Sequence, residues 1–379
     1  MNAKRYNNIK LAIGIGEGIV SFILILLFVW IGYSRELEMY LSNYFTNPYL
    51  LFIAYLFVIG FVGSILSFPI SYYSGFYLEH KYNLSNQTFW KWILEGLKGL
   101  LVSLVIGVPI LLTFYYILNT FYSLWWLPFA TLMFFLSVVL SQIFPILIFP
   151  IFYKITPIEN ENLKERINKL AHDARLKVEN VYKFNMSKNT KKANAAFTGL
   201  GKTKRIILGD TLLDNYSEDE IETVIAHELG HYKKKHIIKN IIIGTTSSFL
   251  TLFIIALLYK NSLSWFGFVS ITEVSALPLL ALWSMVIGIV QSPLGNLLSR
   301  KFEYEADEYA IVETKNPTAF KKTLEKLTDQ NLGDKEPHPF VEWFFYSHPS
   351  IKNRIGAIER FAKEKNIPMQ SELSFESTT

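Results

Sequence analysis

The sequence is organised around one short stretch, Ile225-Ala226-His227-Glu228-Leu229-Gly230-His231. Histidines four residues apart lie on the same face of an α-helix, so both imidazoles can bind one metal ion. Glu228 follows the first histidine and can reach a water molecule at that metal. The stretch predicts a helix that holds a hydrolytic zinc site. The alternative is a charged surface helix that happens to carry two histidines.

The composition is that of a membrane protein rather than a soluble one. Hydrophobic residues make up 51% of the 379 residues and charged residues only 18%, against about 25% charged residues in soluble domains. Lysines stand beside the long apolar runs, which indicates the flanks of membrane spans and not a nucleic-acid surface. The chain has no cysteine, so disulfides, thiolate nucleophiles and cysteine-ligated zinc are excluded.

Six stretches are long and apolar enough to cross a bilayer, which takes about 20 residues. They are 11–33, 50–73, two spans within 99–153, 241–259 and 274–299. The segment 99–153 has no charged residue, and we expect its two spans to be separated by a turn at Asn119-Thr120. The first run is longer than the apolar region of a signal peptide, so we expect it to remain as a span. The predicted fold is mainly α, a polytopic membrane bundle of about six spans.

Basic residues in the short connections set the expected orientation. The N-terminal tail and the 74–98 connection contain Lys4, Arg5, Lys10, Lys81, Lys91 and Lys98. The loops on the opposite side offer only Arg35 and Lys260. The positive-inside rule then places both termini and the polar segments 154–240 and 300–379 in the cytoplasm.

We expect two domains. Residues 1–153 would form a membrane domain of four spans, and residues 154–379 a zinc metallopeptidase domain interrupted by the spans at 241–259 and 274–299.

Within the polar segments of the second domain, helices are expected at 158–176, from 217 onward and at 317–327, and β-type runs at 178–185, 193–198 and 205–208. The helix opened by the capping pattern Ser217-Glu218-Asp219-Glu220 is expected to continue past Lys233-Lys234-Lys235 into the fifth span. Pro337–Tyr346 is expected to be a loop.

A hydrolytic zinc needs a third protein ligand and an open position for water. His236 lies about 180° around an unbroken helix from His227, so it cannot share the ion. Glu303 and Asp307 fit better, because they stand four residues apart on a helix that follows the sixth span. We expect Glu303 to bind the metal and Asp307 to accept the ring N–H of a ligand histidine. Glu305 falls on another face, where a solvated charge is expected.

Taken together, these motifs resemble those of the type I CAAX prenyl endopeptidases, which are membrane-embedded gluzincin peptidases. The heat-shock peptidase HtpX is a more distant relative. The resemblance rests on His227–His231, Ser299–Asp307, Ser347-His348-Pro349 with Arg354, Asn194–Phe197, Arg205–Leu213 and Glu79–Thr88. The motifs cover nearly the whole chain in matching order. Eukaryotic members have an additional N-terminal span and long loops that are absent from this sequence.

The resemblance implies further roles for individual residues. Asn194 and Ala195 would hold the substrate backbone along an edge strand, and His348 would donate a hydrogen bond to the oxyanion. Arg354 would be structural and pair with an acidic neighbour. Glu228 would act as general base and then as general acid. The cofactor would be one Zn²⁺ per chain.

The expected protein is therefore an integral-membrane zinc metalloendopeptidase that cuts peptide bonds at or within the cytoplasmic membrane face. Its membrane would be the inner or plasma membrane of a prokaryote or the endoplasmic reticulum of a eukaryote. The expected partners are the lipid bilayer and a peptide or protein substrate, with a lipidated or an unmodified C-terminus. No nucleic-acid partner is expected, and the sequence leaves the oligomeric state open.

Two alternative functions compete with this prediction. A quality-control peptidase of the HtpX type would use the same residues. A non-enzymatic transporter or binding protein with a structural metal is disfavoured, because no internal repeat is visible and a structural zinc needs four protein ligands where three are found.

Overall fold

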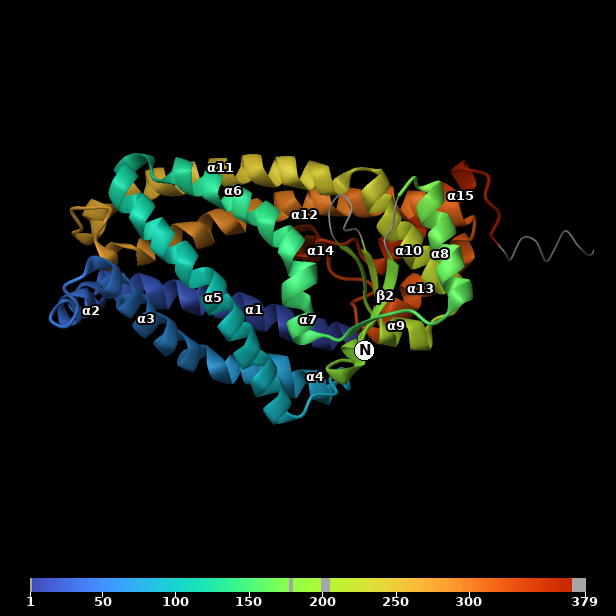
Figure 1. Ribbon diagram of the computed structural model, residues 1–379, viewed down its shortest axis with the longest axis horizontal. Coiled ribbons are helices and arrows are strands. Elements are labelled where there is room, and N and C mark those ends of the chain that lie inside the picture. The colour runs from blue at the N-terminus through green and yellow to red at the C-terminus, as the bar shows by residue number, and fades with distance from the viewer. Residues whose placement is uncertain (1, 177–179, 199–204, 370–379) are drawn as a thin grey trace, which may run out of the picture.

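The computed structural model describes residues 2–176, 180–198 and 205–369 (Figure 1). Six of its helical segments are long and apolar enough to span a membrane, which confirms the predicted number. They are Asn2–Trp30, Pro48–Lys81, Phe89–Leu124, Trp126–Phe152, His236–Phe266 and Val274–Thr314. The long helices extend along the molecule, and the sheet lies toward one end together with most of the shorter helices (Figure 1).

The N-terminal half is built from long apolar helices joined by short turns. Its elements are α1 (Asn2–Trp30), α2 (Tyr33–Ser42), α3 (Pro48–Ser71), α4 (Leu78–Lys81), α5 (Phe89–Phe121), α6 (Trp126–Ile143) and α7 (Phe149–Phe152). The predicted turn at Asn119-Thr120 was wrong. Both side chains donate to carbonyls one turn back, at 2.7 and 2.8 Å, and so remain inside α5. The chain turns instead at Tyr122, whose φ is +45°.

The sheet has four strands in the order β1-β2-β4-β3. They are β1 (Ile155–Pro157), β2 (Asn180–Phe184), β3 (Ala195–Thr198) and β4 (Arg205–Gly209). β2 and β4 are parallel, whereas β1 and β3 are antiparallel to their neighbours. The three predicted β-type runs are therefore strands, although residues 178–179 lie outside the described residues, and β1 was not predicted. β3 is an edge strand.

Two helices pack against or follow this sheet. In α8 (Glu161–Asp173) the predicted stripe of Leu163, Ile167 and Leu170 is buried against the strands. The short helix α9 (Asp210–Asn215) follows β4 directly. Burial of the stripe supplies the apolar core beneath the helix that carries the histidines.

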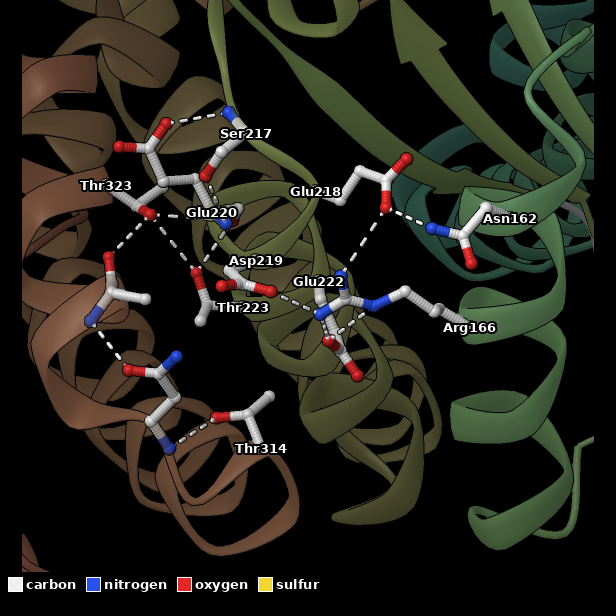
Figure 2. A network of polar contacts seen from close by, with 12 residues as sticks. Asn162, Arg166, Ser217, Glu218, Asp219, Glu220, Glu222, Thr223, Thr314 and Thr323 are labelled. Carbon is white, nitrogen blue, oxygen red and sulfur yellow. Dashed lines mark hydrogen bonds and ion pairs between the residues drawn. The ribbon is translucent and has the colours of Figure 1, made fainter.

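The N-terminus of α10 (Glu218–Lys233) is fixed by polar contacts from several elements (Figure 2). As predicted, Ser217 and Glu220 form a reciprocal capping box, with N–H to oxygen distances of 2.9 and 3.3 Å. Arg166 of α8 donates to Glu222, with 3.0 Å between Nε and Oε2. Lys326 of α13 (Pro317–Gln330) donates to Glu220 at 3.1 Å. Burial alone would raise the pKa of Glu220, but the Ser217 N–H and the Lys326 ammonium lower it below its ordinary value.

The prediction that α10 continues into the fifth span was wrong. Lys235 has φ +59° and ψ +32°, which breaks the helix, and α11 (His236–Ser262) begins at the next residue. A residue with a side chain in this left-handed conformation costs about 1–2 kcal/mol. The break turns His236 toward the histidines of α10.

The long helix α12 (Pro278–Thr314) runs from the membrane to the histidines and crosses α10 closely. At the crossing, a Cβ on Gly230 would lie 3.0 Å from backbone atoms of Ala306. Glycine is therefore required for the two helices to approach this far.

Two helices complete the domain beyond α13, namely α14 (Pro339–Phe345) and α15 (Ile351–Glu364). The expected loop over Pro337–Tyr346 was therefore wrong in part. Pro339 stands at the first turn of α14, where its missing N–H leaves no hydrogen bond unmade. Arg300 of α12 donates to the carbonyl of Tyr346 at 2.6 Å and so fixes the segment that leads to His348.

Candidate active site

Three predicted metal ligands meet where α10 crosses α12. His227 Nε2 lies 3.2 Å from His231 Nε2, and the Glu303 carboxylate lies 3.5 Å from the first and 3.3 Å from the second. Each residue offers one ligand atom, and these atoms all lie within 4.8 Å of one another. His227 and Glu303 are buried. The arrangement is that of three donor atoms directed at one point.

The chemistry of these donors fits a divalent cation. Glu303 Oε2 is buried and accepts no hydrogen bond of normal geometry from the residues that the structure describes. Burial opposes a charge on His227, but the neighbouring carboxylates of Asp307 and Glu303 outweigh burial and raise its pKa to about 9. The cluster therefore favours positive charge at this point, and a bound metal ion would supply it.

Asp307 and Arg354 lie directly behind His227. The Asp307 side chain is fully buried, and its Oδ1 lies 2.9 Å from His227 Nδ1. Arg354 donates to both oxygens of Asp307, through Nε at 2.9 Å and Nη2 at 2.5 Å. Such a bidentate pair fixes the carboxylate, and the carboxylate fixes the imidazole with Nε2 facing Glu303.

The remaining predicted site residues line one cavity of about 180 Å³ in front of the ligands. Asn194, Ala195, Glu228 and His348 all contribute to its wall, together with His227, Glu303 and Arg354. His348 Nδ1 lies 2.9 Å from Glu303 Oε2, and 64% of the His348 side chain is exposed. The cavity therefore places a carboxylate, an imidazole and an edge strand around the same small volume.

The start of the edge strand is held by a residue that sequence reasoning missed. Asn331, just after α13, accepts from the N–H of Ala193 at 2.9 Å and donates to its carbonyl at 3.2 Å. The carbonyl of Asn194 accepts from the N–H of Gly209 at 2.9 Å. Asparagine at a helix end is an ordinary capping residue, so no local signal pointed to this contact.

Two further missed residues stand behind His231. His236 Nδ1 lies 3.0 Å from His231 Nδ1, and His236 Nε2 lies 2.9 Å from Glu305 Oε2. The expectation of a solvated Glu305 was wrong, because this carboxylate is bound to a buried histidine and to Lys239. His236 is not placed among the three ligands, in agreement with the prediction.

Comparison with known proteins assigns the family. The family model described as Peptidase family M48 matches residues 157–362, more than half of the chain. The chain belongs to peptidase family M48. A second family model, described as the CAAX prenyl protease N-terminal region with five membrane helices, matches residues 1–154. Within the described part of that region, four segments are long and apolar enough to span a membrane.

Several M48 proteins are similar over most of their length. The chain is 31% identical to an uncharacterized metalloprotease of Bacillus subtilis, covering 97% of this chain and 86% of that protein. It is 31% identical to CAAX prenyl protease 1 of Saccharomyces cerevisiae, covering 83% and 73% respectively. The crystal structure of Ste24p from S. mikatae superposes with a TM-score of 0.85 at 28% identity, covering 94% of this chain and 88% of that one.

These findings confirm the predicted class. The protein is an integral-membrane metallopeptidase, and therefore a hydrolase, built like CAAX prenyl protease 1. The transporter alternative is excluded by membership of a peptidase family. The HtpX alternative is less well supported, because the similar proteins of yeast, plants and mammals are named CAAX prenyl protease 1 or its homologue.

Proposed function

We propose that this M48 member is a zinc metalloendopeptidase of the type I CAAX prenyl protease kind, acting at the cytoplasmic face of its membrane. The observation that carries the proposal is the convergence of His227, His231 and Glu303 on one point, beside Glu228 and the edge strand. Three ligands leave a fourth position open, as a catalytic metal requires.

The spacing of the donor atoms supports zinc, with one ion per chain. Metal–ligand bonds of about 2.0–2.1 Å in a tetrahedron place neighbouring ligand atoms about 3.3–3.4 Å apart. The two histidine Nε2 atoms are 3.2 Å apart, and each has a different Glu303 oxygen beside it, Oε1 at 3.3 Å from His231 and Oε2 at 3.5 Å from His227. Two imidazoles and a carboxylate are also ligands that zinc accepts readily.

The residues around the ligands divide the work of amide hydrolysis. Zinc, when bound, supplies Lewis-acid activation of water and of the scissile carbonyl. Glu228 takes a proton from the attacking water and delivers it to the leaving amine. His348, with most of its side chain exposed toward the cavity, donates a hydrogen bond to the oxyanion that develops on the substrate.

The substrate backbone lies along the edge strand at Asn194 and Ala195. β3 pairs with β4 on one side, with Ala195 opposite Leu208, and the start of β3 borders the cavity. An extended peptide can add to such an edge as a further strand. The two hydrogen bonds between Asn331 and Ala193, one donated by each residue, fix the position of this edge relative to the three candidate ligands.

Exposed aromatic side chains favour a lipid-bearing substrate. Phe340, Trp343 and Phe345 of α14 are 56%, 48% and 37% exposed. α14 lies directly before the segment that carries His348. An isoprenoid chain attached near the scissile bond could pack against these rings.

The orientation and the domain division are part of the same proposal. The basic residues near the site end of α1 and in the 74–98 connection support a cytoplasmic site. Residues 1–153 would form the membrane domain with four spans, and residues 154–379 the peptidase domain with two. A cytoplasmic site also matches a substrate that is lipidated inside the cell.

The test uses the full chain purified in detergent, with its zinc content measured. Glu228→Gln is expected to keep zinc and to lose cleavage by about 10²–10⁴-fold. Glu165→Gln, an exposed change on α8, is the matched control. Cleavage by Glu228→Gln at the control's rate would refute the mechanism.

The substrate class is tested with two peptides of one sequence, farnesylated and unmodified. Preferential cleavage of the farnesylated peptide is expected. Equal cleavage of both would instead favour the quality-control alternative.

A further inference from the structure

The break at Lys235 brings together two histidines that a continuous helix would separate. Positions 231 and 236 are five residues apart, which places them about 140° apart around an α-helix. With Lys235 in the left-handed conformation, His236 Nδ1 lies only 3.0 Å from His231 Nδ1. Non-glycine residues in such strained backbone conformations cluster at functional sites, where the strain helps to position other groups.

The His236 ring is held firmly in this position. It is 1% exposed and stacks on Phe302 of α12, with ring centroids 4.2 Å apart and an angle of 9° between the planes. Its second nitrogen, Nε2, lies 2.9 Å from Glu305 Oε2. Lys239 lies 3.4 Å from the same oxygen and 5.1 Å from the Phe302 ring. The far end of the contact is therefore a carboxylate anchored by a cation.

The direction of these hydrogen bonds follows from the position of the metal ligands. His231 Nε2 faces Glu303 at 3.3 Å and His227 Nε2 at 3.2 Å, so Nε2 must offer its lone pair to the metal. The proton of neutral His231 then stands on Nδ1 and is donated to His236 Nδ1. His236 in turn carries its proton on Nε2 and donates it to Glu305. A single arrangement of protons satisfies all three groups.

We propose that His236 and Glu305 are positioning residues that hold His231 in the tautomer and ring orientation needed to bind the metal. This inference rests on the proposed zinc site. A hydrogen-bond acceptor behind a ligand imidazole raises its basicity and fixes its plane, and losing it typically costs about 10–100-fold in metal affinity or activity. Both histidines are thus supported by a carboxylate on the Nδ1 side. Asp307 contacts His227 directly, whereas Glu305 supports His231 through the His236 imidazole.

The two supports share α12 but use different partner helices. The pair behind His227 joins α12 to α15 through Asp307 and Arg354. The pair behind His231 joins α11 to α12 through His236 and Glu305. A change in one support should therefore leave the hydrogen bonds of the other intact.

The inference is tested by metal affinity in the full chain, measured by competition with a chromophoric zinc chelator. Glu305→Gln is the main variant, and His236→Phe keeps the stacking on Phe302 but removes the acceptor. His236→Phe is expected to bind zinc about 10–100-fold more weakly than wild type, and Glu305→Gln, whose amide oxygen still accepts from His236 but carries no charge, about 10-fold more weakly. His236→Asn retains an acceptor near the position of Nδ1 and should recover part of the loss.

The matched control is Glu308→Gln, a change on the same helix. The Glu308 carboxylate lies 3.0 Å from Lys365 Nζ. Its zinc affinity should stay within twofold of wild type. The visible absorption spectrum of the cobalt-substituted protein gives a second readout. Because a reoriented imidazole alters the ligand field, the spectrum should change in Glu305→Gln and not in Glu308→Gln.

The outcomes separate the two proposals. If wild type binds zinc and Glu305→Gln matches Glu308→Gln in both affinity and cobalt spectrum, the positioning role is overturned and the zinc site stands. If wild type binds no zinc, both proposals are overturned. Should His236→Phe fail to fold, Glu305→Gln decides the question, because it alters a partly exposed carboxylate.

Discussion

Replacement of Arg354 by methionine tests whether the buried ion pair behind His227 holds the site together. Arg354 donates two hydrogen bonds to Asp307, and the Asp307 side chain is fully buried. Methionine fills similar space without the charge. Asp307 would then lose both hydrogen bonds from Arg354 and, among the described residues, keep its contact with His227. Breaking one side of a buried pair costs about 3–5 kcal/mol.

This free energy should be visible in thermal unfolding of the metal-loaded protein in detergent. One kcal/mol corresponds to about 2–4 °C for a unit of 150–250 residues, so the expected fall in Tm is about 6–20 °C. Tryptophan fluorescence follows the transition. Arg360→Met, an exposed change on the same helix, is the control and should shift Tm by less than about 2 °C.

A double-mutant cycle decides whether the loss comes from the unpaired charge. Asp307→Asn combined with Arg354→Met removes both charges. The double variant should therefore lose less free energy of unfolding than the two single variants lose in total. The expected difference is about 0.5–3 kcal/mol. Strictly additive effects, or an Arg354→Met Tm equal to that of Arg360→Met, would refute the reasoning.

Three further predictions follow from contacts near the site. Glu220→Gln should lower the free energy of unfolding by about 1–3 kcal/mol at pH 7. Because the folded-state pKa of Glu220 is lowered, its contribution to stability is complete above the unfolded-state pKa and is lost as the pH falls through the folded-state pKa. The free energy of urea unfolding should therefore change less between pH 7 and pH 3 in the variant than in wild type. Gly230→Ala places a Cβ 3.0 Å from the Ala306 backbone, and should cost about 1–3 kcal/mol and reduce zinc content, measured by metal analysis. Asn331→Leu removes both hydrogen bonds to the Ala193 backbone and so loosens the start of the edge strand. KM for a peptide substrate should therefore rise, while zinc affinity stays unchanged.

The cluster of His227, His231 and Glu303 could be predicted from the sequence because the spacing within each helix is local. His227 and His231 stand four residues apart on one helix, and so do Glu303 and Asp307 on another. Both patterns survive folding, since an α-helix fixes which side chains share a face. The six spans were predictable for a similar reason, because long uncharged runs have few alternatives to crossing a bilayer.

The residues that support the ligands depend on contacts that no local pattern encodes. The break at Lys235 falls in a run of lysines without glycine or proline, so periodicity gave no sign of it. His236 meets Glu305, and Asn331 meets Ala193, only when segments far apart in the chain come together. The turn after α5 came three residues later than predicted, since Asn119 and Thr120 can bond to carbonyls within a helix.

The position of Glu303 on α12 sets the order in which the site can form during synthesis. His227 and His231 leave the ribosome together, but their third partner follows only after α11 and most of α12 have been made. Glu303 can reach α10 only after α11 and the preceding part of α12 have been synthesised. A chain that has translated the whole histidine motif is therefore still unable to close its metal site. Peptidase activity through this site would therefore begin only after most of α12 has been synthesised.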